Sequence, residues 1–232
     1  MLVADLTWPE ADALDAAVLL VPLGATEQHG PHLPLSTDTD IAVELCRRVA
    51  GRYSNVLVAP AIPYGASGEH AGFPGTVSIG QAALELLVVE LCRSATATFE
   101  RILLVSGHGG NLEPLDRAVA VLRGESRDVR LYLPRWQGDP HAGRSETALQ
   151  LAIDPARVRL ERAEKGDTRA LSEIMPLLRS GGVRAVSPNG VLGDPVGACA
   201  IEGRELLDRL TADLVAHIRR SWPDTLAEGH PR

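Results

Sequence analysis

Short apolar segments alternate with longer amphipathic segments along the chain, and Gly and Pro residues separate them. The apolar segments are rich in Val, Leu and Ile, which is typical of strands that are buried on both faces. These predicted strands cover residues 18–23, 56–59, 102–105 and 129–133. The amphipathic segments predict helices over residues 40–50, 81–98, 112–122 and 203–220. The alternation predicts β-α units around a mostly parallel central sheet.

Polar residues concentrate in the loops that follow the four predicted strands. The sequences of these loops are GATEQHGPHLPLSTD, PYGASGEHAGFPGTVS, SGHGGN and PRWQGDPHAGRSET. In an open α/β sheet, ligands usually bind beyond the carboxyl ends of the strands. We therefore expect the four loops to converge on one pocket.

The composition narrows the class of protein. A chain of 232 residues with 45% hydrophobic content is expected to form one domain over residues 1–232 with a well-buried core. The net charge is -7, and the sequence contains no long run of Lys and Arg. A nucleic-acid partner would require a basic surface, so we expect none.

The sequence also bears on location. The first 15 residues contain four acidic residues, no basic residue and Pro9, which does not fit a signal peptide. The apolar stretches are far shorter than the roughly 20 residues of a membrane helix. A cytoplasmic protein without a membrane partner is therefore expected. Cys46, Cys92 and Cys199 are widely spaced and are predicted to be small core residues rather than disulfide or zinc-binding cysteines.

Glu27 and His29 stand two residues apart just after the first predicted strand. In an extended chain this spacing turns both side chains to the same side, so a carboxylate and an imidazole can share a metal ion. Asp38 follows after two prolines and a glycine that would fold the segment back. Thr37, Asp38 or Asp40 could instead simply cap the helix that follows. The nearby Glu27 and His29 favour metal binding by Asp38, and both interpretations stay open.

His108 lies in the sequence SGHGGN, directly after a predicted strand and before a predicted helix. Glycines on both sides let the backbone approach a ligand and leave the imidazole uncovered. A phosphate-binding turn is the alternative, although SGHGGN matches neither the dinucleotide-binding fingerprint nor the P-loop. Glu27, His29, Asp38 and His108 are together the ligand types expected for zinc, iron or manganese, and a carboxylate such as Asp38 can bridge two ions.

His141 and Glu146 occur in the sequence DPHAGRSET, after the fourth predicted strand. A His-Ala-Gly sequence alone says little about function, but its position opposite three other polar loops favours a role in the same pocket. His141 is expected to transfer a proton to the departing amine, because an imidazole titrates near neutral pH.

The other histidines and one further glutamate are weaker candidates. Glu69 and His70 stand beside the sequence FPGT, and this segment is predicted to form the pocket wall rather than to supply ligands. His32 has two prolines within two residues and is predicted to support the site from behind its ligands. His217 and His230 are predicted to be surface residues.

Together, the motifs LGATEQHGPHLPLSTDT, PYGASGEHAGFPGTVS, SGHGGN and HAGRSET resemble those of the creatininase family of amidohydrolases, in the same order and over most of the chain. This resemblance implies a creatininase-like three-layer α/β/α fold with a mostly parallel central sheet. It also implies hydrolysis of an amide bond and a homo-oligomer. The implied cofactor is one or two divalent metal ions (Zn, Fe(II) or Mn), held by Glu27, His29, Asp38 and His108, with Asp38 as the bridging ligand.

This chain departs from the creatinine hydrolases of that family at one ligand. Those enzymes carry a His-Tyr-Glu tripeptide whose glutamate binds the metal, whereas this chain has His108-Gly109-Gly110. Glu146 is the natural candidate for the missing ligand and for a catalytic role, because its motif is shared and a carboxylate is required. Creatinine hydrolases also close aromatic residues over the substrate, but aromatic residues make up only 3% of this chain. Creatinine is therefore a poor fit.

The loop SGHGGN, the short chain and the segment SPNGVLGDPVGACAIEGRELLDRLTADLV are most similar to the branch of the family that serves mycofactocin biosynthesis. Members of that branch are peptidases that remove the modified C-terminal Val-Tyr dipeptide portion of a small precursor peptide. The expected partner is therefore a small peptide or a small amide. Hydrolysis of creatinine, a formamide or a lactam stays an alternative activity, and a binding protein of this fold that has lost catalysis is the non-enzyme alternative.

Overall fold

The structure is a computed structural model, and it describes residues 1–228. Within those residues, four parallel strands form one sheet in the order β2-β1-β3-β4. Their bounds are β1 (Val18–Leu23), β2 (Val56–Val58), β3 (Arg101–Ser106) and β4 (Asp128–Tyr132). All four apolar segments are therefore strands, and each predicted boundary lies within one residue of the observed one.

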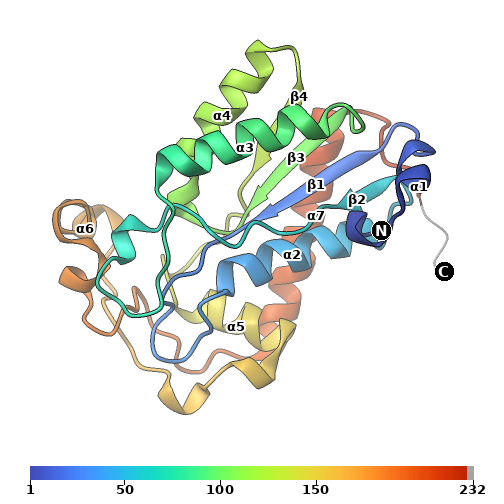
Figure 1. Ribbon diagram of the computed structural model, residues 1–232. Coiled ribbons are helices and arrows are strands. Elements are labelled where there is room, and N and C mark those ends of the chain that lie inside the picture. Colours follow the sequence, from blue (N-terminus) through green and yellow to red (C-terminus); the bar gives the residue numbers. More distant parts are fainter. Residues whose placement is uncertain (229–232) are drawn as a thin grey trace.

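Helices cover both faces of the sheet, so the fold has three layers (Figure 1). The helices α3 and α4 pack together on one face, and α2, α5 and α7 form the layer on the other face. The helix bounds are α1 (Trp8–Asp12), α2 (Thr37–Ala50), α3 (Gln81–Ala95), α4 (Leu112–Gly124), α5 (Arg144–Ile153), α6 (Leu171–Val186) and α7 (Ala200–Ser221). This is the three-layer α/β fold with a parallel sheet that the sequence predicted.

The central strand β1 is apolar throughout because both of its faces are buried. Successive side chains of a strand point to opposite faces of the sheet. Val18 and Leu20 belong to the core beneath α2 and α7, whereas Leu19 and Val21 belong to the core beneath α3 and α4. All six residues of β1 are buried. Because both faces are covered, the strand appears as a continuous apolar run rather than as an alternation.

Several helices differ from the sequence prediction, and α2, α5 and α6 do so most informatively. Helix α2 begins at Thr37, three residues earlier than predicted, and this places Asp38 inside its first turn. The end of the loop assigned to PRWQGDPHAGRSET is in fact the start of α5, and six consecutive residues of this helix, 146–151, are buried, so it shows no amphipathic period. Helix α6 contains Pro176 and a kink at Gly182, where φ is 69°. Both residues disfavour a continuous helix, so the sequence pattern did not predict this one.

Two of the three cysteines are buried as predicted, and one is not. Cys46 and Cys92 are buried as predicted, but Cys199 is exposed just before α7, so its prediction as a core residue was wrong.

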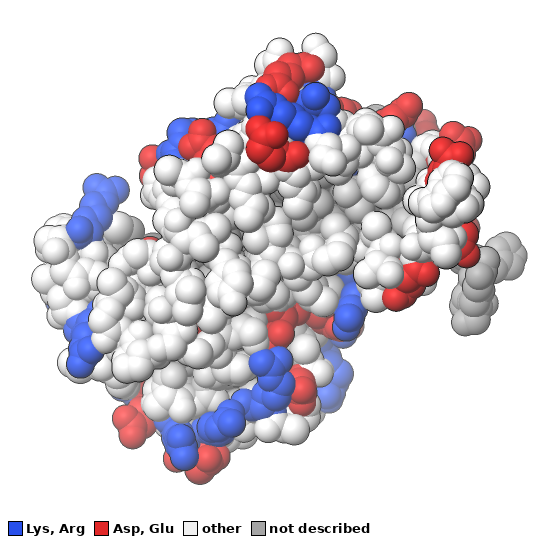
Figure 2. Space-filling view, in the orientation of Figure 1, with Lys and Arg blue, Asp and Glu red and all other residues white. Residues whose placement is uncertain are grey.

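Among the described helices, none combines the length and the apolar character needed to cross a bilayer. On the face shown in Figure 2, acidic and basic side chains are interspersed along the edges, and the centre carries little charge.

Candidate metal centre

Six acidic and histidine side chains meet at the carboxyl edge of the sheet. Parallel strands all end at this edge, so the loops that follow them come together although they are far apart in sequence. All six side chains are buried. They are Glu27 and His29 between β1 and α2, Asp38 in α2, His108 after β3, His141 before α5, and Glu146 in the first turn of α5.

Asp38 lies between two histidines. Its Oδ1 is 3.2 Å from Nε2 of His29, and its Oδ2 is 3.2 Å from Nδ1 of His108. The N-cap of α2 is Ser36, and Asp38 makes no capping hydrogen bond. The alternative that Asp38 merely caps the helix was therefore wrong.

Two groups of three potential ligands share Asp38. In each group, one ligand atom from every residue lies within 4.8 Å of the others. The first group is Glu27, Asp38 and His108, and the second is His29, Asp38 and Glu146. Two neighbouring triads with a common carboxylate form the arrangement that two divalent cations bridged by Asp38 would need. A third such group joins Glu27 and His29 to His141.

The carboxylates at the centre are not satisfied by the protein. Both oxygens of Glu27 and Oδ2 of Asp38 are buried and accept no hydrogen bond. Nδ1 of His108 lies 3.3 Å from Glu27 Oε1, which is an ion-pair distance without good hydrogen-bond geometry. Burying a charged oxygen without a partner is costly. A divalent cation would offset this cost, so the residues present fit a bound metal ion.

The two histidines are oriented as metal ligands usually are. Nδ1 of His29 is 3.2 Å from the backbone oxygen of Glu27, and Nε2 of His108 is 3.2 Å from the backbone oxygen of Ala66. A ligating histidine typically donates its other ring N–H to such a carbonyl oxygen. This leaves Nε2 of His29 and Nδ1 of His108 free to face the carboxylates.

Charges within the cluster shift the pKa values strongly. Burial lowers the pKa of His29, but Asp38 and the other nearby carboxylates outweigh burial and raise it to about 10. Burial alone would likewise lower the pKa of His108. Glu27 and Asp38 outweigh burial, and the pKa lies well above its usual value. Burial raises the pKa of Glu146 above its usual range. The carboxylates therefore hold protons on both imidazoles, and a bound cation would displace these protons.

The turn after β3 leaves no room for a side chain at position 110. A Cβ atom on Gly110 would lie 2.4 Å from Nε2 of His108 and 2.6 Å from the backbone oxygen of Ala66. This turn therefore cannot present the glutamate that the His-Tyr-Glu sequence supplies unless neighbouring groups move. Glu146 approaches the cluster from α5 instead, and its Oε2 is 3.9 Å from Nε2 of His29.

The segment His141-Ala142-Gly143 is held in an unusual backbone conformation. His141 and Leu192 exchange backbone hydrogen bonds, which fix the chain beside the histidine. The next residue, Ala142, has a φ of 52°, which is uncommon for a residue other than glycine. The backbone N–H of Ala142 donates to Oε2 of Glu146 at 2.6 Å. One turn thus positions both His141 and Glu146.

Sequence reasoning gave too little weight to the loop after β2. His70 is buried, its Nε2 lies 3.2 Å from Glu27 Oε1, and its ring centroid is 4.5 Å from that of His141. Oε1 of Glu69 lies 3.5 Å from Nε2 of His108. The His70 side chain therefore belongs to the cluster. The signal available in the sequence was the position of GEH after a strand, as in the other three loops.

Gln28 and the three remaining histidines differ in how they relate to the cluster. Gln28, which the sequence analysis did not single out, is buried, and its side chain contacts both His70 and His141. His32 is buried behind the cluster, and its Nε2 is 2.8 Å from Oγ1 of Thr147. His217 is half-buried and packs against the ring of Tyr132, so the prediction of a surface position was only partly right. His230 lies outside the described residues.

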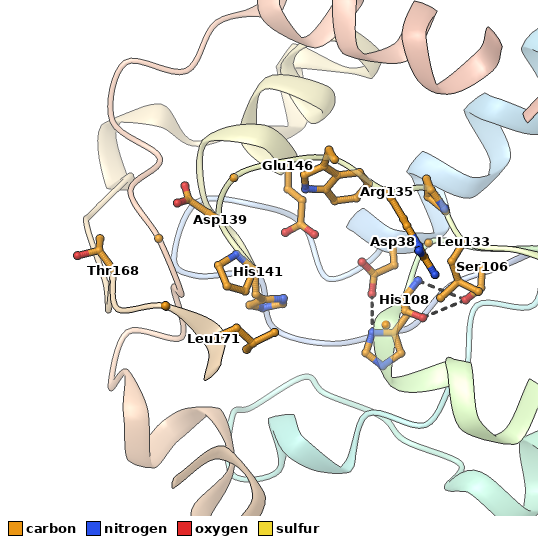
Figure 3. A pocket seen from close by; sticks show the side chains of 18 of the residues that line it. Asp38, Ser106, His108, Leu133, Arg135, Asp139, His141, Glu146, Thr168 and Leu171 are labelled. Atoms are coloured by element: carbon orange, nitrogen blue, oxygen red, sulfur yellow. Dashed lines mark hydrogen bonds and ion pairs between the residues drawn. The ribbon is translucent and has the colours of Figure 1, made fainter. Parts of the chain in front are cut away.

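Two cavities, of about 670 Å³ and about 1020 Å³, open onto the cluster. In the first, Asp38, His108, His141 and Glu146 point into the same space (Figure 3). This cavity extends to Arg135 and Trp136, whereas the second extends between α4 and α6. The residues that line both cavities are His108, Gly109, Pro140, His141 and Leu171. The cluster therefore lies where the two cavities meet.

The three-layer fold and this carboxylate–imidazole cluster together define an α/β protein with a candidate metal centre. Comparison with known proteins shows the family to which this α/β protein belongs. The chain belongs to the creatininase family, because the family model described as creatinine amidohydrolase matches residues 4–218. It is accordingly a hydrolase that acts on amide bonds.

Proteins with different activities are similar to this chain. The chain is 50% identical over 215 residues to the mycofactocin precursor peptide peptidase of Mycolicibacterium smegmatis, with 89% of this chain and 86% of that protein covered. It is 30% identical over 259 residues to the creatinine amidohydrolase of Pseudomonas putida, with 96% and 98% covered.

Solved structures agree with the family assignment. A mutant creatininase described as the Zn-Zn type matches with a TM-score of 0.80 at 27% identity, covering 96% of this chain and 98% of that one. A structure described as creatininase Mn matches with a TM-score of 0.79 at 26% identity over the same shares. The predicted fold and family are thereby confirmed.

Proposed function

We propose that this chain is a metal-dependent peptidase that cleaves the mycofactocin precursor peptide and releases its modified C-terminal Val-Tyr dipeptide. The relatives that are about half identical over most of the chain carry the corresponding peptidase name. The observation that carries the proposal within the structure is the position of the cluster between two cavities. A peptide needs space on both sides of its scissile bond, and these cavities supply it.

Five side chains would hold the metal. Asp38 would bridge two ions, Glu27 and His108 would complete one site, and His29 and Glu146 would complete the other. When bound, divalent ions such as Zn, Fe(II) or Mn would polarise the scissile carbonyl and lower the pKa of a bound water toward about 7. The unsatisfied oxygens of Glu27 and Asp38 support this assignment.

His141 would carry the proton. It lies beside the cluster and lines both cavities, so its imidazole borders the space where the scissile bond would lie. Burial and the charge of His29 lower its pKa well below the usual value, so the imidazole is neutral and can accept a proton from the attacking water. Passing this proton to the departing nitrogen lets the amine leave in its neutral form.

The cavity lining bears on the choice of substrate. A combined space of this size exceeds what a small planar ring such as creatinine would fill, and within the cavity-lining residues Trp136 is the only aromatic side chain apart from the histidines. Both features favour an extended peptide. Hydrolysis of creatinine, a formamide or a lactam is the alternative activity, and it rests on membership of the same family.

The substrate is tested with the metal-loaded protein and mass spectrometry. We expect a synthetic precursor peptide that ends in Val-Tyr, with and without its modification, to lose the C-terminal dipeptide, and creatinine to stay intact. The chelated protein is the matched control. Creatinine hydrolysis without peptide cleavage would overturn the peptidase assignment but not the amidohydrolase class. Peptide binding without turnover by the metal-loaded protein would favour the non-catalytic alternative.

The proposal extends to the oligomeric state of the protein and to its location in the cell. We propose a homo-oligomer, on the grounds of family resemblance, and a location in the cytoplasm. Sedimentation analysis of the purified protein tests the assembly, and a monomer at all concentrations would contradict it.

A further inference from the structure

Gln28 stands between the proposed ligands Glu27 and His29, and its side chain is buried among groups from three distant loops. Its amide nitrogen Nε2 is 3.0 Å from Nδ1 of His70, 3.0 Å from Nε2 of His141 and 3.0 Å from the backbone oxygen of Gly190. An amide nitrogen carries two hydrogens, so it can donate to only two of these three groups.

Backbone groups fix the orientation of the Gln28 amide. The N–H of Gly30 donates to Oε1 at 2.9 Å, and the backbone oxygen of Gly190 accepts from Nε2 at 3.0 Å. A backbone N–H can only donate and a carbonyl oxygen can only accept, so a flipped amide would lose both bonds. One of the two Nε2 hydrogens is therefore committed to Gly190.

The second hydrogen goes to His70. Nε2 of His141 lies 2.9 Å from the backbone oxygen of Gln28, and this contact is favourable only if Nε2 of His141 carries a proton. A protonated Nε2 cannot accept from the Gln28 amide, so the remaining hydrogen is donated to Nδ1 of His70. His70 then holds its own proton on Nε2, which faces Glu27 Oε1 at 3.2 Å.

We propose that Gln28 is a positioning residue that fixes the tautomer of His70 through its side-chain amide and that of His141 through its backbone oxygen, so that Nδ1 of His141 is the unprotonated nitrogen that faces the metal centre. This nitrogen lies 3.9 Å from Glu27 Oε1. The tautomer assignment rests on the contacts alone, whereas its effect on turnover rests on the proposed function. If His141 accepts a proton during hydrolysis, Nδ1 is the atom that receives it.

The backbone around Gln28 is shaped to hold this amide. Gly190 has a φ of +80°, and a Cβ atom there would lie 1.9 Å from Oε1 of Gln28. Gly30 also has a positive φ, of +65°. Both positions suit glycine, because other residues rarely adopt this conformation. A side chain at position 190 would therefore occupy the space that the Gln28 amide fills.

The tautomers are tested by two-bond ¹H–¹⁵N correlation spectra of zinc-loaded protein labelled with ¹⁵N-histidine. We expect both His70 and His141 to show the Nε2–H tautomer, with signals assigned from the single variants His70→Gln and His141→Gln. In Gln28→Glu the carboxylate accepts instead of donating, so the proton of His70 should move to Nδ1. His141 should keep its Nε2–H through the backbone oxygen of residue 28.

Controls separate this effect from general disturbance. Gln150 is a second buried glutamine, and its amide contacts Thr37 and Asp40 rather than a histidine, so Gln150→Glu should leave both tautomers unchanged. If Gln28→Glu does not fold, Gln28→Met removes the donor without adding charge, and His70 should then populate both tautomers.

Turnover gives an independent readout. Loss of a supporting hydrogen bond at a metal site typically costs about 10- to 100-fold in activity, and we expect Gln28→Glu to lower kcat by that factor. An Nδ1–H tautomer of His141 in the wild-type protein, or an unchanged His70 tautomer in Gln28→Glu, would overturn the proposal. Expected tautomers in a protein that cleaves no peptide would overturn the proposed function and leave the tautomer assignment standing.

Discussion

At the scale of single residues, Glu146 supplies the carboxylate that the turn after β3 cannot present, because that turn has Gly110 in place of a glutamate. Its Oε2 accepts a hydrogen bond from the Ala142 N–H and lies 3.9 Å from Nε2 of His29. We predict that Glu146→Gln lowers both bound metal and turnover, because a neutral amide is a poor ligand for a hard cation. The loss should reach at least about 10- to 100-fold, the range seen when only an outer partner of a metal ligand is removed.

Metal content by elemental analysis and peptide turnover test the role of Glu146. Glu44→Gln is the matched control, because Glu44 pairs with Arg48 on α2 and does not belong to the cluster. A Glu146→Gln variant with wild-type metal content and rate would show that the site is complete without this carboxylate.

His141 gives the second prediction at this scale. It lines both cavities and lies beside the proposed ligands without belonging to either of the triads that share Asp38. We predict that His141→Ala retains its metal and loses about 10²- to 10⁴-fold in kcat, the usual contribution of general acid–base catalysis. His217→Ala removes a half-buried histidine outside the cluster and serves as control. Loss of the ion from His141→Ala would instead make His141 a ligand, as its grouping with Glu27 and His29 allows.

At the scale of elements, the turn between β3 and α4 sets the shape of the site. Its two adjacent glycines differ sharply, since a Cβ on Gly110 would lie 2.4 Å from Nε2 of His108, whereas a Cβ on Gly109 would meet nothing within 4 Å. We predict that Gly110→Ala lowers the free energy of unfolding by about 1–3 kcal/mol, as overpacking typically does. Gly109→Ala should change it much less. Urea unfolding of both variants measures this difference, and equal stabilities would contradict the packing seen here.

Burial also explains which strands and helices the sequence pattern predicted. The strands β1 and β3 were evident because burial on both faces produces uninterrupted Val, Leu and Ile. Helix α5 was not evident, because tertiary contacts bury six of its consecutive residues, including Glu146 and Gln150, and no polar face marks its period. Helix α6 was hidden by Pro176 and Gly182.

At the scale of the whole molecule, the metal would act on stability as well as on activity. Both oxygens of Glu27 and Oδ2 of Asp38 are buried without a hydrogen-bond partner, and a bound cation would supply the missing partner. We predict that chelation abolishes activity and lowers the Tm, and that Zn, Fe(II) or Mn restores both. A ligand that binds only the folded state adds about 2.7 kcal/mol at a hundred times its Kd. Calorimetry with metal titration checks the shift, and full activity in metal-free protein would contradict the metal centre.

The sequence by itself determined the parallel α/β fold and the chemical types of the candidate ligands. Burial imposes a local hydrophobic pattern, and the polar residues Glu27, His29, Asp38 and His108 stood out because they follow buried strands. Tertiary structure alone decided that Asp38 lies between two histidines, that His70 joins the cluster, and that Gln28 contacts a carbonyl 162 residues away. These contacts depend on strand order and on how each loop folds, and neither leaves a periodic trace in the chain.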